Sequence, residues 1–324
     1  MYLRNIKIIF MAMVGLLCLN CNVDNGYQPH LMKPIAKKNY HEILFALDKK
    51  YWKGDLGKTI KNSFEKLVKT TPLPYEKEFD TDFVVPNKIL KNIKNNNCFV
   101  FVQIENYNSK NIVPIIKKDL WANGQLIIEL KFKSEKDAIN YFKHNKSEVK
   151  SILKKFNLNK IQKNFSEKNS LNEELEKSID LKFKAPDGIK LNKKAKNFWW
   201  WSKLEIQKDQ NGSHEIQTGI ILHQEDYENK NQFEKSKILS VKDSLGGAYL
   251  TGKKNNSFMK TVENEISIPM DTSFYINNKY VKQIKGCWRM QNDKMGGPFI
   301  SYSWLNNKKT KIITAQGYVY APNF

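Results

Sequence analysis

The sequence is poor in arginine. Of its 54 basic residues only Arg4 and Arg289 are arginines, although the formal net charge is +21. Nucleic-acid surfaces use arginine for bidentate contacts with bases and phosphates, and no recognised nucleic-acid-binding motif accompanies the charge here. The lysines are instead spread along the chain among many asparagines and isoleucines, the bias that an AT-rich genome produces. The charge therefore does not predict a nucleic-acid partner.

Motifs that carry chemistry are also absent from the sequence. It has no HExxH helix, no GxSxG elbow, no Walker loop, no GxGxxG and no CxxC or CxxCH. His214 and His223 are followed by acidic residues, but nine residues along a strand would separate their imidazoles widely. We predict no metal, no cofactor and no catalytic residue, although the separation of acids such as Asp119 and Asp187 cannot be read from sequence.

Cysteine is scarce, with four residues in the chain. Two of these, Cys98 and Cys287, fall in the folded part, each in an apolar, strand-like segment. An exported protein could join them in one disulfide. Their contexts favour free, buried thiols.

The N-terminus has the pattern of an export signal. Arg4 and Lys7 precede an apolar run at residues 8–19 that is too short for a comfortable membrane span, and Cys21 follows. We predict a lipoprotein signal peptide at residues 1–20, lipidation of Cys21 and a flexible tether at residues 21–38. Asn20 departs from the usual small residue before the lipidated cysteine, so an uncleaved anchor or an ordinary signal is the alternative.

The remaining chain predicts an α+β fold of mixed α/β layers. Residues 39–156 alternate strands and helices, 157–180 form a polar helical connector, and 181–324 are strand-rich and end in a β-hairpin. The two halves can form one domain, and their similar order of elements suggests a loose duplication. Predicted strands span 41–47, 79–85, 98–102, 126–132, 181–184, 198–204, 216–223 and 280–288; predicted helices span 55–68, 86–94, 134–156 and 231–245.

The terminal hairpin is predicted from two apolar runs, 299–305 and 312–320, around the polar turn 306–309. In the first run Ile300, Tyr302 and Trp304 alternate with Ser301 and Ser303, so an aromatic face stands opposite a hydroxyl face. One of these faces is expected to be core. The glycine pairs at 246–247 and 296–297 are predicted to be turns.

Three adjacent tryptophans, Trp199, Trp200 and Trp201, fall on one predicted strand. Trp199 and Trp201 share a face and Trp200 takes the other. A surface tryptophan here would indicate a glycan or lipid contact, but sheet core on both sides is the preferred interpretation.

Arg289 is the candidate ligand contact. In one interpretation it binds an anion or saccharide, with Trp288 or Trp304 as a stacking surface and Asp293 nearby. In the other, which we prefer, it forms an internal ion pair with Asp293 or a glutamate, because arginine is favoured in partly buried pairs.

The terminal segment carries a family resemblance. Its motifs are Gly286, Trp288, the segment 295–299 (MGGPF) and the segment 317–322 (GYVYAP). With Trp52-Lys53-Gly54, 119–122 (DLWA), 185–188 (APDG) and 219–221 (GII), these resemble the domain of unknown function 4837 family from about residue 41 onward. The resemblance implies a bacterial envelope lipoprotein with a mixed α/β fold and no assigned activity. Similar proteins usually continue past the Tyr-Ala-Pro segment into a basic helix, whereas this sequence stops at Phe324.

These observations predict a lipid-anchored cell-envelope protein, periplasm-facing or on the surface, that is not an enzyme and acts in binding or assembly. Its partners would be the membrane, through the lipid, and an envelope protein or a glycan. The alternative is a hydrolase or transferase acting on envelope glycan or peptidoglycan. Two carboxylates converging in a cleft would favour the alternative. The oligomeric state is not predicted.

Overall fold

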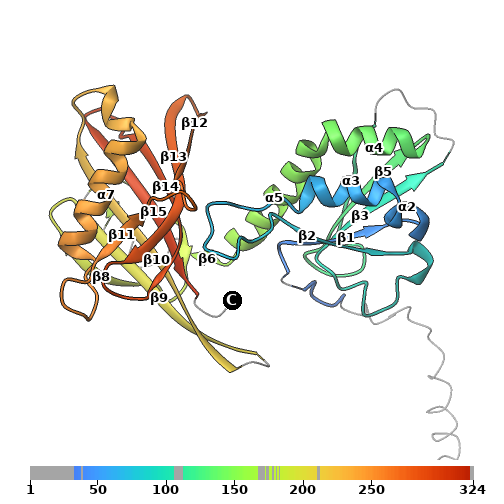
Figure 1. Cartoon of the computed structure of the whole chain (residues 1–324), viewed down its shortest axis with the longest axis horizontal. Coiled ribbons are helices and arrows are strands. Elements are labelled where there is room, and N and C mark those ends of the chain that lie inside the picture. Colours follow the sequence, from blue (N-terminus) through green and yellow to red (C-terminus); the bar gives the residue numbers. More distant parts are fainter. Residues whose placement is uncertain are drawn as a thin grey trace, which may run out of the picture.

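The computed structural model describes residues 33–37, 39–105, 112–166, 172, 175–176, 179, 181, 183–209 and 212–321. The predicted signal peptide, Cys21 and most of the tether lie outside these residues. Within them, no helix is both long and apolar enough to cross a membrane. The structure is α+β, as predicted, with one large sheet in each half of the chain and a short two-stranded ladder besides (Figure 1).

The N-terminal half contains a five-stranded sheet in the order β2-β1-β3-β5-β4. All neighbours are parallel except β4, which runs antiparallel to β5. The apolar run predicted at 98–102 forms the central strand, and its buried residues are covered on both sides, as expected of a parallel strand. The strands are β1 (Glu42–Ala46), β2 (Asp80–Val84), β3 (Cys98–Ile104), β4 (Ile115–Lys118) and β5 (Leu126–Phe132).

Helices cover one face of this sheet and form the first core with it. They are α2 (Lys49–Lys53), α3 (Asp55–Phe64), α4 (Glu135–His144) and α5 (Lys146–Gln162). Ser134 caps α4, because its hydroxyl accepts a hydrogen bond from Asp137 N. The single helix predicted at 134–156 is instead two helices that meet at Asn145, and α3 ends at Phe64, so Leu67 and Val68 lie beyond it.

The opposite face of the sheet packs against a shorter segment. Buried Ala46, Phe99 and Ile127 contact the partly buried side chains of Ile89 and Ile93. The helix predicted at 86–94 shrinks to one 3-10 turn, η1 (Pro86–Lys88). The two faces together enclose β1, β3 and β5.

The C-terminal half contains an eight-stranded antiparallel sheet, ordered β11-β13-β14-β15-β10-β9-β8, with β12 also paired to β13. Since the first sheet is mainly parallel, the strand orders do not support the suggested duplication. Three of these strands, β8, β11 and β12, were not predicted. The strands are β8 (Lys190–Ala195), β9 (Phe198–Asp209), β10 (Gly212–Asp226), β11 (Met259–Val262), β12 (Met270–Ile276), β13 (Lys279–Met290), β14 (Gly296–Leu305) and β15 (Lys311–Tyr320).

Helix α7 (Lys235–Tyr249) lies on one face of the large sheet, after the 3-10 turn η2 (Lys230–Phe233) (Figure 1). The turn predicted at 246–247 is wrong, because both glycines lie inside α7. A Cβ at Gly246 would lie 2.0 Å from Met259 O. Glycine therefore allows the helix to approach β11 closely.

The other face of the large sheet buries Trp199 (3% exposed) and Trp201 (0%) against Leu175, Ala185 and Ile189. Trp200 packs on the α7 face, so the predicted division of the three tryptophans is confirmed. The strand predicted at 181–184 is wrong for the residues described there. The chain instead forms the short ladder of β6 (Phe165–Ser166) with β7 (Ala185–Pro186).

The terminal hairpin is present as β14 and β15, but the predicted turn at 296–297 is wrong. Gly296 and Gly297 lie inside β14, where a Cβ at Gly297 would lie 1.9 Å from Val319 O. Close packing, not a turn, therefore requires glycine at Gly297. The hydroxyl face is the more deeply buried one, with Ser301 2% and Ser303 1% exposed beneath α7.

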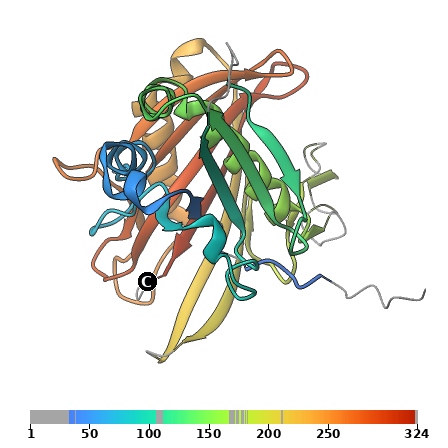
Figure 2. The same cartoon turned by 90° about the vertical axis from the view of Figure 1, so that its right-hand side faces the viewer.

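Two hydrogen bonds join the loop at 65–79 to the C-terminal half. Tyr75 Oη donates to Ile266 O at 2.5 Å, and Cys287 Sγ donates to Thr70 O at 3.5 Å. Cys287 and Cys98 are both buried and unpaired, as predicted. Figure 2 views the molecule from the N-terminal half and shows the β9–β10 hairpin projecting beyond the rest of its sheet.

Candidate functional site

The structure separates the predicted ligand contacts along the large sheet. Trp304 pairs with Val281 in the β13–β14 register, whereas Arg289 pairs with Gly296. Arg289 is thus eight residues beyond Val281 on β13, which at the usual strand rise is roughly 26 Å. Arg289 and Trp304 therefore do not form one site.

Trp288 is a core residue. It is 2% exposed and packs edge-on against Tyr318, with ring centroids 5.3 Å apart. Its indole N–H donates to Val319 O at 3.3 Å. A buried ring of this kind stabilises the sheet and leaves no face for a ligand.

Asp293 pairs with a lysine, not with Arg289. Its carboxylate accepts hydrogen bonds from Lys294 N (2.7 Å) and Lys254 Nζ (3.1 Å), which lower its pKa. Arg289 is exposed and forms no ion pair with any residue that the structure describes. The preferred ion pair between Arg289 and Asp293 is therefore absent.

Trp304 lines a hollow of about 570 Å³, which we call the Trp304 hollow. Its size is that of a small-molecule site. One side is apolar and the rim is polar, with three lysines and several amides. The lining residues are Glu176, Ile179, Leu181, Gln224, Lys279, Trp304, Asn306, Asn307, Lys308, Thr310, Lys311 and Ile313.

The apolar side of the Trp304 hollow follows from strand alternation. Trp304 on β14 stands beside Ile313 on β15, and both belong to the core on the face away from α7. Ile179 and Leu181 pack against the same core. Trp304 is only partly buried, so part of its ring reaches the hollow.

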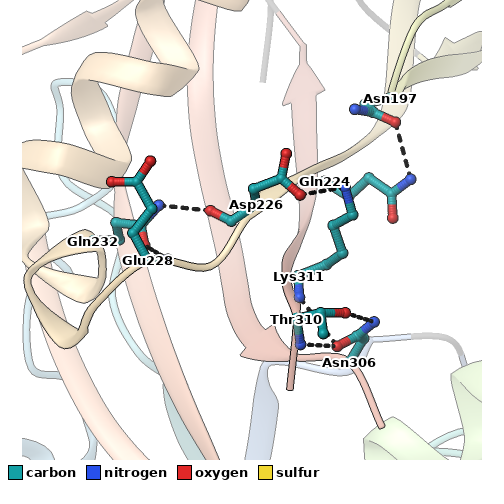
Figure 3. A network of polar contacts seen from close by, with 8 residues as sticks. All are labelled: Asn197, Gln224, Asp226, Glu228, Gln232, Asn306, Thr310 and Lys311. Atoms are coloured by element: carbon teal, nitrogen blue, oxygen red, sulfur yellow. Dashed lines mark hydrogen bonds and ion pairs between the residues drawn. The ribbon is translucent and has the colours of Figure 1, made fainter. Parts of the chain in front are cut away.

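Hydrogen bonds at the turns hold the polar rim in place (Figure 3). Asn306 Oδ1 accepts from the backbone N–H groups of Thr310 (2.9 Å) and Lys311 (3.1 Å), which closes the hairpin turn. Gln224 Nε2 donates to Asn197 Oδ1 at 3.0 Å and ties β10 to the β8–β9 turn. The rim is thus built by side chains from three separate turns and strands.

The lysines of the rim differ in whether their ammonium groups have partners within the protein. Lys279 Nζ donates to Asn307 Oδ1 at 2.7 Å, and Lys311 Nζ lies 2.5 Å from Asp226 Oδ1. Lys308 is exposed at the tip of the turn and has no ion pair within the described part of the chain. It is the cation most available to a ligand.

A second hollow of about 550 Å³ lies beside α7 and β11; we call it the Arg289 hollow. Lys235, Lys260 and Arg289 line it together with two acids, Asp243 and Glu263. Asp243 is committed to the protein: its Oδ1 accepts from Thr261 N (2.8 Å), Thr261 Oγ1 (2.7 Å) and Lys242 Nζ (3.3 Å). The hollow therefore carries mixed charge.

A third hollow, of about 290 Å³, lies at the amino ends of β1, β2 and β3 and includes Glu42, Asp80 and Asp82. Ligands of parallel sheets usually bind outside the carboxyl ends of the strands. We therefore give it less weight than the Trp304 hollow.

Metal-ligand geometry is absent from the described residues, in which no three His, Cys, Asp or Glu side chains converge. His214 and His223 lie at opposite ends of β10, separated by nine residues, or roughly 30 Å at the usual strand rise. Their sequence contexts do not make a shared site.

Sequence reasoning found Trp304 and the turn at 306–309, which includes Lys308, but did not predict that Lys279 and Lys311 lie beside them. Lys279, Lys308 and Lys311 are three among 54 basic residues, and only the β13–β14–β15 pairing places them together. The turn at 306–309 was one signal for the position of this site, because turns at the same end of a sheet surround one surface.

Comparison with protein families divides the chain in two. Residues 168–324 match the family described as Domain of unknown function (DUF4837), and residues 36–166 match the Domain of unknown function (DUF8532). The motifs at 52–54 and 119–122 thus fall in the second match, and those from 185 onward in the first. No curated protein matches the chain. The match over residues 168–324 confirms, for the strand-rich C-terminal half, the resemblance to the DUF4837 family of unknown function that the motifs at its end predict.

Proposed function

We propose that this protein is a lipid-anchored cell-envelope protein that binds an acidic saccharide in the Trp304 hollow. The observation that carries the proposal is the combination there of an indole, aliphatic side chains and three lysines around about 570 Å³. An indole offers a broad apolar face with a polar edge. The C–H face of a sugar ring matches such a surface, and its carboxylate or phosphate matches the lysines.

The charges of the rim support an anionic ligand over a neutral one. Lys308 approaches the hollow without an ion pair among the described residues, while Lys279 and Lys311 are oriented by Asn307 and Asp226. One acid, Glu176, opposes them among the lining residues. The described rim thus carries an excess of positive charge.

The same lining favours binding over hydrolysis. Glycoside hydrolysis usually requires a pair of carboxyl groups on either side of the bond that breaks. Glu176 is the single carboxylate among the described residues that line the Trp304 hollow. Binding without turnover is the function that this set of side chains supports best.

The envelope anchor rests on the sequence. Residues 8–19 and Cys21 have the pattern of a lipoprotein signal. A lipid on Cys21 would hold the folded halves near an anionic membrane surface. A single acyl chain binds membranes only reversibly, so a lipoprotein anchor needs several chains.

Saccharide binding can be tested with the export-competent Cys21→Ser chain by calorimetric titration of acidic and matched neutral oligosaccharides. Lys308→Gln should weaken acidic-sugar binding severalfold, and Trp304→Met should weaken both the acidic and the neutral series. Lys309→Gln is the matched control, because Lys309 follows in the same turn without lining the hollow. Equal effects of the two lysine variants, with unchanged folding, would refute a specific site.

The anchor can be tested separately by mass spectrometry of the N-terminal peptide and by membrane fractionation. We expect an acylated Cys21 peptide in wild type and release of the Cys21→Ser protein from membranes. An unmodified Cys21 on an intact protein would reject the anchor and leave the saccharide proposal standing.

A second candidate function is glycan hydrolysis or transfer in the Arg289 hollow, favoured by Glu263, which lines it with Arg289. Its test is turnover of labelled envelope glycans by wild type and Glu263→Gln. Turnover that disappears in Glu263→Gln, with folding retained, would replace binding by catalysis as the function.

A further inference from the structure

A small chamber lies between α7 and the face of the large sheet that carries the buried serines; we call it the α7 chamber. Its volume is about 20 Å³. Aliphatic side chains from helix and sheet surround a polar group of sheet residues. The lining residues are Ile221, His223, Ile238, Lys242, Leu245, Leu250, Ser301, Thr314 and Gln316.

Two buried polar atoms at the chamber lack protein partners. His223 is 7% exposed and Gln316 4%, yet neither His223 Nε2 nor Gln316 Nε2 bonds to any protein atom that the structure describes. Buried polar groups in folded proteins are almost always hydrogen-bonded to protein or to ordered water. Two unsatisfied atoms on one cavity therefore indicate a polar molecule between them.

The register places these side chains on the same face of the sheet, two residue pairs apart. His223 pairs with Thr314, and Ile221 pairs with Gln316, so His223 and Gln316 face α7 diagonally across β10 and β15. Ser301 pairs with Gln316 on the next strand. Diagonal neighbours on a sheet are within reach of one bridging molecule.

The chamber carries no net charge. Burial lowers the pKa of His223 to about 4, so the imidazole is neutral near pH 7. Lys242 Nζ points away to Thr261 Oγ1 (3.0 Å) and Asp243 Oδ1 (3.3 Å), and Asp243 balances its charge. An uncompensated ion in such surroundings would be costly, so the bound molecule is neutral.

The volume of the α7 chamber limits which neutral molecule can bind there. A cavity must hold about 10–15 Å³ of water-centre space for one water molecule, and this chamber holds about 20 Å³. An organic ligand would need the helix to move. A single water molecule fits both the volume and the polarity.

We propose that the α7 chamber is a hydration site in which one buried water accepts a hydrogen bond from Gln316 Nε2 and donates one to His223 Nε2. Ser301 Oγ, on the same cavity, is a third polar neighbour for this water. His223 Nε2 is then an acceptor, and the ring proton is on Nδ1. The water links β10 to β15 beneath the helix.

The first test is nuclear magnetic resonance of the full chain with ¹⁵N-labelled histidine. Near neutral pH we expect His223 as the Nδ1–H tautomer and dipolar cross-peaks from its ring and the Gln316 amide to a long-lived water. A proton on Nε2, or cross-peaks typical of fast-exchanging surface water, would overturn the proposal.

The second test compares Gln316→Met with Gln207→Met, an exposed position on β9. Oxygen-17 relaxation should detect one long-lived water fewer in Gln316→Met and no change in the control. The urea midpoint of Gln316→Met should fall, since the water loses a donor. A raised midpoint with an unchanged water count would mean that the chamber is dry.

A third measurement guards against another occupant. Native mass spectrometry of the purified chain should give the mass of the protein alone. A co-purifying neutral organic molecule that Ser301→Val removes by filling the chamber would also overturn the proposal. A Ser301→Val protein that folds and loses one long-lived water supports it.

Discussion

The two halves of this chain differ in how their buried amide side chains are hydrogen-bonded. In the N-terminal half Gln125 Nε2 donates to Lys94 O (2.6 Å) and Asn96 O (2.8 Å), and Asn157 Nδ2 donates to Tyr40 O (2.5 Å). In the C-terminal half the Gln316 amide nitrogen has no protein partner within the described residues. Satisfied amides fix loops to a core, as Gln125 and Asn157 do in the first half, where Gln103 Oε1 is the buried amide atom without a protein partner among the described residues. In the second half it is an amide donor beside the α7 chamber, Gln316 Nε2, that lacks one.

The two cores differ in the same way. Phe45, Phe64 and Phe142 form a fully buried aromatic cluster in the first core, with ring centroids 5.5 to 6.1 Å apart. The sheet face below α7 mixes rings with Ser301, Ser303 and Gln316. The first core thus packs aromatic rings against one another, whereas the core beneath α7 includes buried hydroxyl and amide groups.

The largest effect is expected from Phe142→Ala. Removing a fully buried phenylalanine costs about 3–5 kcal/mol of unfolding free energy. We expect the N-terminal half to melt first in denaturant, followed residue by residue through amide signals, while the C-terminal signals persist. Leu204→Ala, at a position 60% exposed, is the control and should change little. Simultaneous loss of both sets of signals would show that the halves unfold as one unit.

An intermediate effect is expected from pH. The unfolded chain binds a proton on histidine near pH 6.5, whereas burial lowers the pKa of His223 to about 4 in the folded state. Between these values the unfolded state binds more protons, so stability falls as pH decreases, by up to about 3 kcal/mol.

This dependence of stability on pH can be measured as the change in urea midpoint from pH 7 to pH 4.5. His223→Gln should remove most of it, and His144→Gln, at an exposed position, should leave it intact. The carboxyl groups with lowered pKa values, such as Glu78, act at lower pH. A slope that survives in His223→Gln would place its origin elsewhere.

The smallest and most discriminating effect concerns two neighbouring glycines of α7. Gly246→Ala should destabilise the C-terminal half by about 1–3 kcal/mol, because its Cβ would lie 2.0 Å from Met259 O. Gly247→Ala meets its nearest atom at 3.9 Å and should stabilise by up to about 1 kcal/mol through helix propensity. Equal thermal shifts for the two would contradict the close helix–strand contact.

The sequence predicted elements whose local pattern agrees with their burial. The strand predicted at 126–132 has the same bounds as β5, and the helix predicted from residue 134 begins one residue before α4. By contrast β8 reads KLNKKA, with exposed lysines along a sheet edge. Edge strands carry such charges to prevent further pairing, so their strand signal is weak.

The glycine pairs and the candidate site show a second limit. The turns predicted at Gly246 and Gly297 are wrong, because glycine is required at each position by a backbone oxygen from a neighbouring strand. The separation of Arg289 from Trp304, and the meeting of Lys279 with Lys308, depend on strand register. Strand register depends on pairing across the whole sheet, so it cannot be predicted from the sequence of any one segment.

The contact between Gly246 and Met259 also has a kinetic consequence. Together with the hydrogen bonds of Asp243 to Thr261, this close approach holds the carboxyl-terminal part of α7 against β11, so we expect the helix to lift from the sheet first at its amino end. A molecule enclosed beneath α7 can leave only when the helix partly detaches from the sheet. Its exchange with bulk solvent would therefore be timed by local opening of α7, at the rate at which the amide hydrogens of that helix exchange.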